Sequence, residues 1–404
     1  MPNFIISTHE STGQSLSAGE VGVVTQDGSI TNTAAISAIN AFATTGNINI
    51  LVNGGVIGAG GFFSNGIDMD TETGKIFIGQ SGYVTSTGGN GITVDFDTLV
   101  SVSNDGTISG DSRGIFARVS DDAGFFRVVN TGTVNALREG VVVDTGTGNG
   151  TIINSGTITS SINGIRIGLF NDNTGSAFTI SNSGRIEAPT RAIIGSEEDM
   201  TLLNTGSILG DILLDAGNDI YRGASGRLEG FIDAGAGDDL VIAGSDNDTL
   251  LGQNGIDELR GGAGDDTLRG GNDDDTLLGQ AGDDFLAGGG GDDKLLDGAG
   301  DDRLSGFGGE DLLNGGRGDD GLTGGAGADI FEFFRSAGND TIWDFQNGVD
   351  RIDLTAFNVF FSDINAAVTN RWGNAVIDLD ALGGSGSILI MGAAGQLDAS
   401  DFIL

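Results

Sequence analysis

The sequence predicts an all-β protein of stacked parallel coils: a right-handed parallel β-helix, then a parallel β-roll, then a small C-terminal β capping region. Two internal repeats carry this prediction. One is a nine-residue unit that divides residues 234–332 into eleven copies without a gap. The other is a looser unit that recurs eight times from residue 26 to residue 208, at intervals of 22 to 28 residues. Such periods are the signature of solenoids, in which each unit packs against its neighbours.

The nine-residue unit is clearest from Gly261 to Arg269, and it keeps two positions throughout. The sixth position is aspartate and the eighth is a large apolar residue in all eleven units. We expect the apolar side chain to point inward from a short strand, and the preceding glycines to turn the chain, because glycine permits positive φ and close backbone approach. Two units make one flattened coil, so the eleven units predict nine stacked aspartate pairs in two columns.

These aspartates are the candidate metal ligands. Two carboxylates about 5 Å apart repel by about 1–3 kcal/mol at effective dielectric constants of 80 to 20, and residues 234–332 hold 24 acidic against 5 basic side chains. Calcium takes six to eight oxygen ligands, whereas magnesium prefers to keep its water, and the absence of Cys and His from the span disfavours softer metals. The predicted Ca²⁺ ligands are Asp239, Asp248, Asp257, Asp266, Asp275, Asp284, Asp293, Asp302, Asp311, Asp320 and Asp329.

The units resemble the G-G-x-G-x-D-x-U-x nonapeptides of the RTX (repeats-in-toxin) family. The resemblance implies a calcium-bound β-roll that stays unfolded in the calcium-poor cytosol and folds after export. A disordered acidic tract is the alternative, but composition alone does not produce an eleven-fold register. Some units depart from the glycine pattern, and for their turns the resemblance does not predict whether a calcium site forms. The departures are Ala234, Ala243 and Asp297 at the first position, Gln253, Gln280 and Phe307 at the second, and Asp246 and Asp273 at the fourth.

The residues after the nonapeptides are expected to cap the roll. Apolar residues spaced two apart predict strands at Ile352 and Leu354, Ile377 and Leu379, and Ile388 and Ile390. The region also resembles the C-terminal region of serralysin-type RTX proteins, including an acidic residue followed by three apolar ones, D-F-I-L, at the end. That resemblance implies recognition by a type I exporter. The first residues, MPNFIISTHESTG, lack the basic and apolar regions of a cleaved secretory signal.

The looser repeat has the motif [Asn or Gln]-x-Gly-x-[Ile or Val] and predicts three strands per unit, hence a parallel β-helix. Its polar residues should stack in one turn with their amides bonded from coil to coil. The pattern resembles β-helical passenger and adhesin repeats. The motif starts at Gln26, Asn53, Gln80, Asn104, Asn130, Asn154, Asn182 and Asn204, with apolar positions at Ile30, Ile57, Val84, Ile108, Val134, Ile158, Ile186 and Ile208.

Two outward rows of the predicted β-helix carry polar side chains that could bind a ligand or do chemistry. One is charged and reads Asp70, Asp95, Arg118 and Asp144 from coil to coil. It suits a glycan ligand, a polysaccharide lyase or an epimerase, since RTX-bearing alginate epimerases join a β-helix to RTX modules. A solvated face is the favoured interpretation. Tyr83 and His9, the acid–base partners that an epimerase would use, are not expected on this row. Arg166 and Arg191 are expected to be surface charges. The other row is hydroxylic, and a flat ladder of this kind can bind ice or glycans. Because Arg185 and Glu187 interrupt it, ordinary β-propensity on a pleated face is the better account. The row contains Ser29, Thr31, Thr107, Ser109, Thr133, Thr157 and Thr159.

Composition limits the possible functions. The 404 residues carry a net charge of −39, which opposes nucleic-acid binding. There is no cysteine and one histidine, so thiolate and two-histidine metal sites are excluded. No apolar run approaches the roughly 18 residues of a membrane span, and we therefore expect a chain that does not cross a membrane.

We predict four regions: an N-terminal cap at 1–25, the β-helix at 26–215, the RTX β-roll at 216–332, and a capping and secretion region at 333–404. The expected function is that of a secreted calcium-binding protein with a binding or structural role outside the cell, in adhesion, matrix or surface layer. The alternative is a polysaccharide lyase or C5-epimerase acting through the β-helix. The expected partners are calcium, a type I exporter, and extracellular glycans or a cell surface. We assign no catalytic residue.

Overall fold

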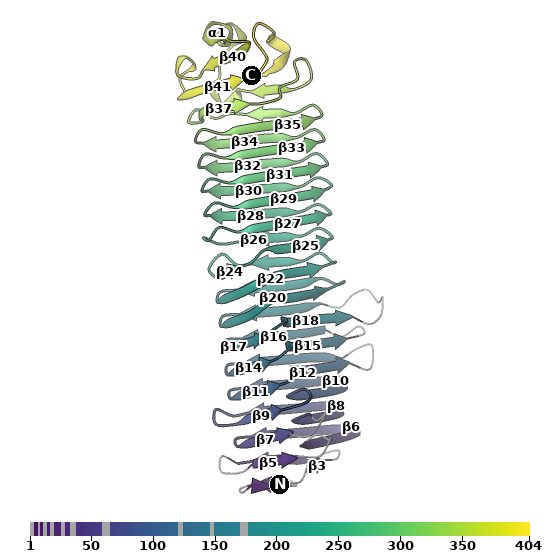
Figure 1. Cartoon of the computed structure of the whole chain (residues 1–404). Coiled ribbons are helices and arrows are strands. Elements are labelled where there is room, and N and C mark those ends of the chain that lie inside the picture. The colour runs from purple at the N-terminus through teal and green to yellow at the C-terminus, as the bar shows by residue number, and fades with distance from the viewer. Residues whose placement is uncertain are drawn as a thin grey trace. The chain divides into compact units, whose positions relative to one another are not determined.

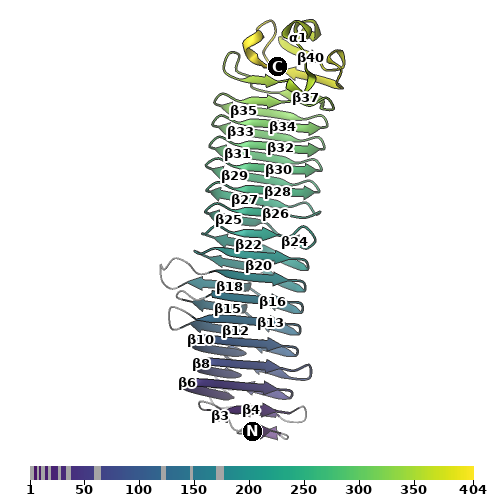
Figure 2. The same ribbon diagram turned by 180° about the vertical axis from the view of Figure 1, so that it is seen from behind.

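The computed structural model describes residues 4–6, 9–10, 14–16, 20–25, 29–32, 38–58, 65–119, 124–145, 149–169 and 177–404. The chain divides into two compact units, Met1–Gly230 and Phe231–Leu404, which we call unit 1 and unit 2. In each unit the strands stack coil upon coil and pair in parallel (Figure 1; seen from behind in Figure 2). Among the described strands, antiparallel pairing occurs only near the C-terminus.

Unit 1 is a parallel β-helix with three ladders of strands. The first ladder contains β3 (Gln14–Leu16), β6 (Ile39–Val52), β8 (Ile67–Ile78), β10 (Ile92–Asn104), β12 (Arg113–Val119), β15 (Glu139–Thr145), β18 (Asn163–Leu169), β20 (Arg185–Ser196) and β22 (Ser207–Asp215). The second contains the later halves of β6, β8 and β10 together with β1 (Phe4–Ile6), β4 (Val21–Val24), β13 (Phe125–Asn130), β16 (Asn149–Asn154), β19 (Phe178–Asn182), β21 (Met200–Asn204) and β23 (Ile220–Arg222). The third contains the early halves of β20 and β22 together with β2 (His9–Glu10), β5 (Ser29–Asn32), β7 (Gly55–Gly58), β9 (Tyr83–Ser86), β11 (Thr107–Gly110), β14 (Thr133–Ala136), β17 (Thr157–Ser160) and β24 (Arg227–Glu229).

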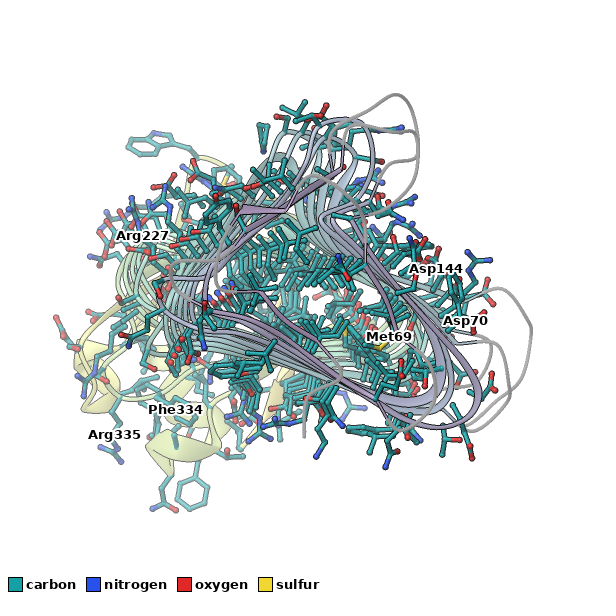
Figure 3. All side chains as sticks on the ribbon, turned by 90° about the horizontal axis from the view of Figure 1, so that it is seen from below. Met69, Asp70, Asp144, Arg227, Phe334 and Arg335 are labelled. Carbon is teal, nitrogen blue, oxygen red and sulfur yellow. The ribbon has the colours of Figure 1, made fainter. Side chains whose placement is uncertain are left out.

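The interior of unit 1 is filled by alternate residues of these strands, because successive side chains of a strand point to opposite faces. Ile92 and Val94 of β10 are fully buried, whereas Asp95 is half-buried. Figure 3 shows Met69 inside the coil and its neighbour Asp70 on the outer side. The same apolar position recurs in each coil, so the core is a stack of equivalent side chains.

A column of buried asparagines runs through unit 1 and confirms the predicted amide stacking. The Nδ2 of each asparagine donates to the Oδ1 of the next one, with N···O distances of 2.7–2.9 Å. Each amide both donates and accepts, which satisfies it in a dry interior. The column contains Asn104, Asn130, Asn154, Asn182 and Asn204.

The column does not include the earlier motifs, and there the prediction was wrong. Ile78 and Val52 occupy the register positions that continue the column below Asn104. Asn53 therefore follows the column position Val52 by one residue, and Gln80 follows the column position Ile78 by two. Gln80 is exposed. The motif start at Gln26 lies outside the described residues.

The expected inward position at Ile57 was also wrong. Val56 pairs with Ile30 and with Val84 and is fully buried, whereas Ile57 pairs with Thr85. A shift of one residue in the preceding turn moves a strand's side chains to the opposite face. The adjacent glycines Gly54 and Gly55 allowed two alignments of the motif, and the structure adopts the one in which Gly55 pairs with Tyr83.

Unit 2 begins as a parallel β-roll in which each strand pairs with the strand two places later. The register offset is 18 residues, as between Leu250 and Leu268. One ladder contains β25 (Ile232–Ala236), β27 (Thr249–Asn254), β29 (Thr267–Asn272), β31 (Phe285–Gly290), β33 (Arg303–Gly308), β35 (Gly321–Ala326), β37 (Gly338–Ile342) and β41 (Gly386–Ile390). The other contains β26 (Leu240–Ile242), β28 (Glu258–Ala263), β30 (Thr276–Ala281), β32 (Lys294–Ala299), β34 (Leu312–Arg317), β36 (Ile330–Glu332), β38 (Arg351–Asp353) and β42 (Phe402–Ile403).

The turns of the roll use positive φ at the second and fourth positions of the unit, for example 116° at Gly262 and 108° at Gly264. Three units carry a larger residue at the second position and keep the same backbone. Their φ angles are 84° at Gln253, 83° at Gln280 and 76° at Phe307. The departures from glycine therefore leave the path of these turns unchanged.

The last part of unit 2 closes the roll with a small mixed structure. The three predicted strands correspond to β38, β40 (Asn374–Asp378) and β41, and their six apolar residues are fully buried. The remaining elements are β39 (Val368–Arg371), α1 (Phe361–Ala367), η1 (Thr355–Phe357), η2 (Asp380–Leu382) and η3 (Ala399–Asp401). Within the described part of the chain, none of the helices has the length and apolar character that crossing a membrane requires.

Candidate metal centre

The eleven sixth-position aspartates form two buried columns. From Asp257 onward, the Oδ1 of each accepts a hydrogen bond from the backbone N–H of the aspartate 18 residues earlier, at 2.7–3.0 Å. These are the nine stacked pairs that the repeat predicted. None of the eleven is more than 4% exposed. One column contains Asp239, Asp257, Asp275, Asp293, Asp311 and Asp329, and the other Asp248, Asp266, Asp284, Asp302 and Asp320.

The second carboxylate oxygen is left over by this arrangement. Burial raises the pKa of Asp257, Asp266 and Asp275 to about 7, although the backbone hydrogen bonds act in the opposite direction. A buried oxygen of this kind needs a proton or a cation. The Oδ2 is buried and has no hydrogen-bond partner in Asp257, Asp266, Asp275, Asp284, Asp293, Asp302, Asp311, Asp320 and Asp329.

The glycine at the first position of a unit provides the space that this oxygen occupies. A Cβ built on Gly252 would overlap the Oδ2 of Asp257. The carbonyl oxygen of Gly270 lies 2.6 Å from the same Cβ position, and the carbonyl of Gly324 lies 2.7 Å from the equivalent position at Gly306. Carboxylate and carbonyl oxygens therefore converge here, and these are the donors that a hard cation such as calcium takes.

Two further aspartates continue the columns beyond the nonapeptides. Asp340 Oδ1 accepts from the N–H of Asp320 at 3.0 Å, and Asp350 Oδ1 from the N–H of Asp329 at 3.1 Å. Neither was among the predicted ligands, because they follow at 20 and 21 residues instead of 18. The G-N-D and G-V-D triplets that end at these residues were the available signal.

An exposed ladder at the fifth position was also missed. The backbone N–H of Asp283 donates to Asp265 Oδ1 at 3.1 Å, that of Asp301 to Asp283 at 3.0 Å, and that of Asp319 to Asp301 at 2.9 Å. These bonds run opposite to those of the buried columns, because the acceptor belongs to the earlier coil. Neighbouring coils are therefore tied together in both directions at adjacent positions.

Asp297 stands at a first position, where most units have glycine. One carboxylate oxygen each of Asp284, Asp297 and Asp302 lies within 4.8 Å of the others. Burial, followed by the charges of Asp302 and Asp284, raises the pKa of Asp297 to about 10. The sequence marked Asp297 only as a departure from the glycine pattern.

In unit 1 the predicted charged row exists as a set of register neighbours. Asp95 lies between Asp70 and Arg118, and Arg118 pairs with Asp144. The Nε of Arg118 is 3.1 Å from Asp95 Oδ1. The expected solvated face is incorrect for Asp144, which is 4% exposed because the Nη1 of Arg166 covers it at 3.2 Å.

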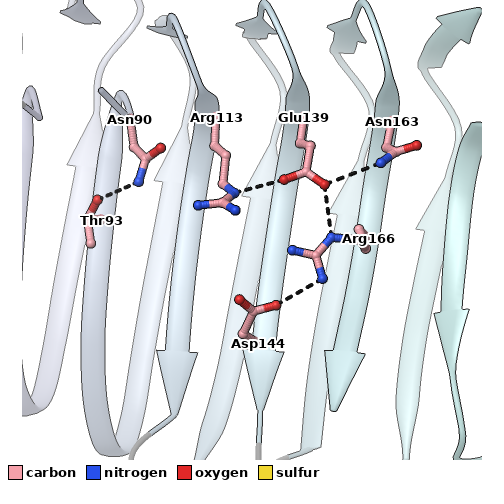
Figure 4. A network of polar contacts seen from close by, with 7 residues as sticks. All are labelled: Asn90, Thr93, Arg113, Glu139, Asp144, Asn163 and Arg166. Carbon is pink, nitrogen blue, oxygen red and sulfur yellow. Dashed lines mark hydrogen bonds and ion pairs between the residues drawn. The ribbon is translucent and has the colours of Figure 1, made fainter. Parts of the chain in front are cut away.

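Glu139 is the centre of a network that sequence reasoning did not find (Figure 4). Its Oε2 is 2.8 Å from Arg113 Nε, and its Oε1 is 2.9 Å from Arg166 Nε and accepts from Asn163 Nδ2 at 3.2 Å. Burial opposes ionisation, but hydrogen bonds from the two arginines keep the pKa of Glu139 below its ordinary value. Arg166 is thus an internal partner of acidic groups, and its expected role as a free surface charge was wrong.

A groove of about 950 Å³ follows the third ladder of unit 1. Its floor includes Thr85, Ser109, Asn135, Thr159 and Glu187, which are register neighbours from coil to coil. Part of the predicted hydroxylic row therefore lines a concave surface. Its side chains offer one hydrogen-bonding group per coil.

Tyr83 lies in the third ladder, where it pairs with Gly55 and Thr107. His9 pairs with Ser29 in the same ladder. The charged row belongs to the first ladder, so both residues are off that row, as expected.

The sequence of unit 2 matches the RTX calcium-binding nonapeptide repeat in four copies, at residues 231–250, 251–286, 287–322 and 306–332. Through this segment the chain belongs to the RTX calcium-binding repeat proteins. The RTX repeats bind Ca²⁺, and the oxygen-lined columns fit that ion. RTX repeat proteins are typically secreted.

Two solved structures are similar to parts of this RTX chain. The AlgE6R3 subunit of the mannuronan C5-epimerase of Azotobacter vinelandii is 31% identical over 33% of this chain and 78% of its own, with a TM-score of 0.21. The extracellular lipase LipA of Serratia marcescens is 15% identical over 61% of this chain and 45% of its own, with a TM-score of 0.23. No curated protein matches the sequence.

Proposed function

We propose that this chain is secreted and that calcium folds its RTX repeats outside the cell, with the eleven sixth-position aspartates as ligands. The observation that carries the proposal is the set of nine buried Oδ2 atoms without a partner, in a segment whose repeats bind Ca²⁺. In the cytosol, stacked carboxylates without metal oppose folding by mutual repulsion and burial. Outside, where extracellular modules bind calcium at about 10⁻⁴–10⁻³ M, the binding free energy becomes folding free energy.

A chelator titration of the full chain followed by circular dichroism tests this proposal. We expect strand signal to fall as calcium is removed and to return when calcium is restored. A triple substitution of Asp257, Asp275 and Asp293 by Asn should lower both calcium uptake and thermal stability in calcium. A roll that is equally structured without calcium, or an unaltered triple variant, would refute the proposal.

The matched control for that variant lies on the exposed ladder. Asn at Asp265, Asp283 and Asp301 keeps the Oδ1 acceptor and removes the same number of charges, but from exposed groups. We expect this control to change calcium uptake much less, because exposed charges are screened by solvent. Equal effects of the two triple variants would assign the metal dependence to net charge alone.

We further propose that residues 333–404 both cap the roll and address the chain to a type I exporter. The resemblance to serralysin-type tails supports export. The capping role is supported by the parallel pairing of Phe402 with Ile352, and by the hydrogen bond from the N–H of Gly348 to Asp401 Oδ1 at 3.0 Å. Secretion from a Gram-negative host should require a co-expressed type I exporter, and secretion without one would contradict this role.

For unit 1 we propose a binding or structural role in adhesion, matrix or surface layer, with glycans as the partner. The groove along the third ladder supports this, because its repeated hydroxyl, amide and carboxylate groups match the hydroxyls of an extended polysaccharide. Binding of the full chain to immobilised polysaccharides tests it. Thr159→Trp fills the groove and should abolish retention, whereas Arg118→Ser on another ladder should not.

The second candidate is a polysaccharide lyase or C5-epimerase acting through the charged row. The observation that favours it is the adjacency of Asp70, Asp95, Arg118 and Asp144 on one ladder. Incubation of the full chain with uronate polymers distinguishes the two roles. Unsaturated chain ends or altered epimer ratios would establish the enzyme and displace the binding role.

A further inference from the structure

Asp297 places a third carboxylate beside one pair of stacked aspartates. In eight of the eleven nonapeptides the first position is glycine, and only one unit has an acidic residue there. The Asp297 carboxylate turns toward Asp284 and Asp302, and one oxygen of each residue lies within 4.8 Å of the others. The other stacked pairs of the nonapeptides have no acidic first-position residue beside them.

Four of the six carboxylate oxygens in this cluster have no hydrogen-bond partner in the described structure. Asp284 and Asp302 are 3% and 1% exposed, and the Oδ2 of each is buried without a hydrogen-bond partner. Both oxygens of Asp297 are buried and equally without a partner. Three carboxylates thus direct unsatisfied oxygens to one place, which is the condition that a divalent cation relieves.

The coil beneath leaves room for the third carboxylate. A Cβ built on Gly279 would overlap both Asp297 Oδ1 and Asp284 Oδ2, so only glycine at this position is compatible with the cluster. Asp297 also borders a cavity of about 460 Å³, lined in addition by Asn314, Arg317 and Glu332, which gives a hydrated ion a route to the site.

We propose that Asp284, Asp297 and Asp302 form a three-carboxylate calcium site, the tightest of the roll and the first to fill. The proposal rests on the calcium-dependent folding proposed above. Affinity for calcium rises with the number of ligand charges and with the rigidity of the site. One additional negative charge within about 5 Å of a divalent ion strengthens binding at least about tenfold even at the dielectric constant of water.

Calorimetric calcium titration of the full chain, wild type against Asp297→Gly, tests the proposal. We expect the wild type to show one site at least about tenfold tighter than the others. Asp297→Gly restores the glycine of the repeat and should remove that class of site, while the roll still folds at saturating calcium. Asp297→Asn keeps the size of the side chain without its charge and should lose the tight site as well.

A transplanted carboxylate is the matched gain-of-function variant. Gly270→Asp places a carboxylate at the equivalent position beside Asp257 and Asp275 in the other column, with Gly252 beneath it in place of Gly279. Its Cβ overlaps the present position of the Asp275 Oδ2, so the Asp275 carboxylate must turn aside to admit it. We expect it to add a second tight site, read in the same titration. A Gly270→Asp variant that folds in calcium without an additional tight site would contradict the proposal.

The outcomes separate this inference from the proposed function. If calcium fails to bind or fold the wild type, the proposed function fails and this site with it. If calcium folds the wild type but Asp297→Gly leaves the tightest site unchanged, the three-carboxylate site is overturned and the proposed function stands. Hydrogen exchange at calcium concentrations that fill one site per chain gives an independent readout, with residues around 284–302 expected to be protected first.

Discussion

Unit 1 has a column of buried asparagines, one per coil from Asn104 to Asn204, and unit 2 has two columns of buried aspartates, one residue per nonapeptide. The two side chains differ in one group. In unit 1 the residue is asparagine, whose Nδ2 donates to the next Oδ1, as from Asn130 to Asn154 at 2.7 Å. In unit 2 it is aspartate, whose Oδ1 accepts from a backbone N–H, as Asp275 does at 2.8 Å. In the asparagine column the amides satisfy one another's hydrogen bonds. In the aspartate columns the Oδ2 of nine residues, from Asp257 to Asp329, has no hydrogen-bond partner.

The comparison teaches how similar geometry gives opposite dependence on the environment. An amide has donors and acceptors in balance and is neutral at every pH, so its column is stable by itself. A carboxylate only accepts and is charged, so its column requires a cation or a proton. Replacing one column's chemistry by the other's, or removing the cation, should therefore break one unit and spare the other.

Calcium removal should have the largest effect. We expect a chelator to raise amide hydrogen exchange across residues 240–330 by at least about a hundredfold, because these coils lose the ion that neutralises them. Residues 100–210 should exchange as before. Equal loss of protection in both regions would show that the Asn column depends on calcium too.

The pH of the calcium-free protein should have the next largest effect, because many carboxylates contribute. Burial raises the pKa of Asp257, Asp302 and Asp311 to about 7 and that of Asp293 to about 6 in the folded roll, against an ordinary value of 3.8. The folded state then binds more protons than the unfolded state between about pH 4 and 7. Stability is therefore greatest below about pH 4 and is lost as pH rises through about 7.

Thermal melting in chelator at pH 4, 5.5 and 7.5 measures this dependence. We expect the melting temperature of the roll to fall at each step. The increase in melting temperature that added calcium produces should be smaller at pH 5.5 than at 7.5, because protons compete for the same oxygens. A calcium-free roll that becomes more stable from pH 4 to 7.5 would contradict the assignment.

Asn154→Asp should break the amide column by introducing the chemistry of unit 2. Asn154 Nδ2 donates to Asn182 Oδ1 at 2.8 Å and to the carbonyl of Arg185 at 3.2 Å, and the substitution removes that donor. We expect a loss of about 2–4 kcal/mol that calcium does not restore. The control is Asn135→Asp, whose exposed Oδ1 only accepts, from Thr159, and should cost less than about 0.5 kcal/mol. Thermal melting reads both, and recovery of Asn154→Asp in calcium would contradict the expectation.

Asp275→Asn is the reverse change and should have the smallest effect. Asparagine keeps the Oδ1 acceptor for the N–H of Asp257 and removes one buried charge. We expect the calcium-free roll to gain about 1 kcal/mol and the calcium concentration for half-folding to rise severalfold. Chelator melts and calcium titrations of the same variant check the two expectations. A variant that reaches half-folding at the same or a lower calcium concentration than the wild type would exclude Asp275 as a ligand.

The sequence predicted the repeating parts of both units well, because the period of the pattern equals the period of the structure. In the nonapeptides the interval is constant, so the eleven aspartates and the nine pairs followed from counting. The asparagine column from Asn104 to Asn204 followed in the same way. Calcium chemistry could be deduced as well, since only oxygen donors are present in the repeats.

What could not be predicted depends on variable loops and on side-chain direction. Coils of unit 1 differ in length, so the motif at Asn53 allowed a slip that buries Val56 in place of Ile57. Asp340 and Asp350 were missed because insertions change their interval. The direction of the Asp297 side chain became visible only once the coils were stacked.

The hydrogen bonds of the aspartate columns all point toward earlier coils, which gives the roll a polarity. A coil is complete only when its successor delivers a carboxylate to its backbone N–H, so the C-terminal end of the roll is intrinsically open. Asp340 and Asp350 end the two columns, because their Oδ1 atoms accept the hydrogen bonds of the last nonapeptide N–H groups, those of Asp320 and Asp329. A roll cut after residue 332 would present those two donors at its end, where a coil from another copy could continue the stack into a fibre.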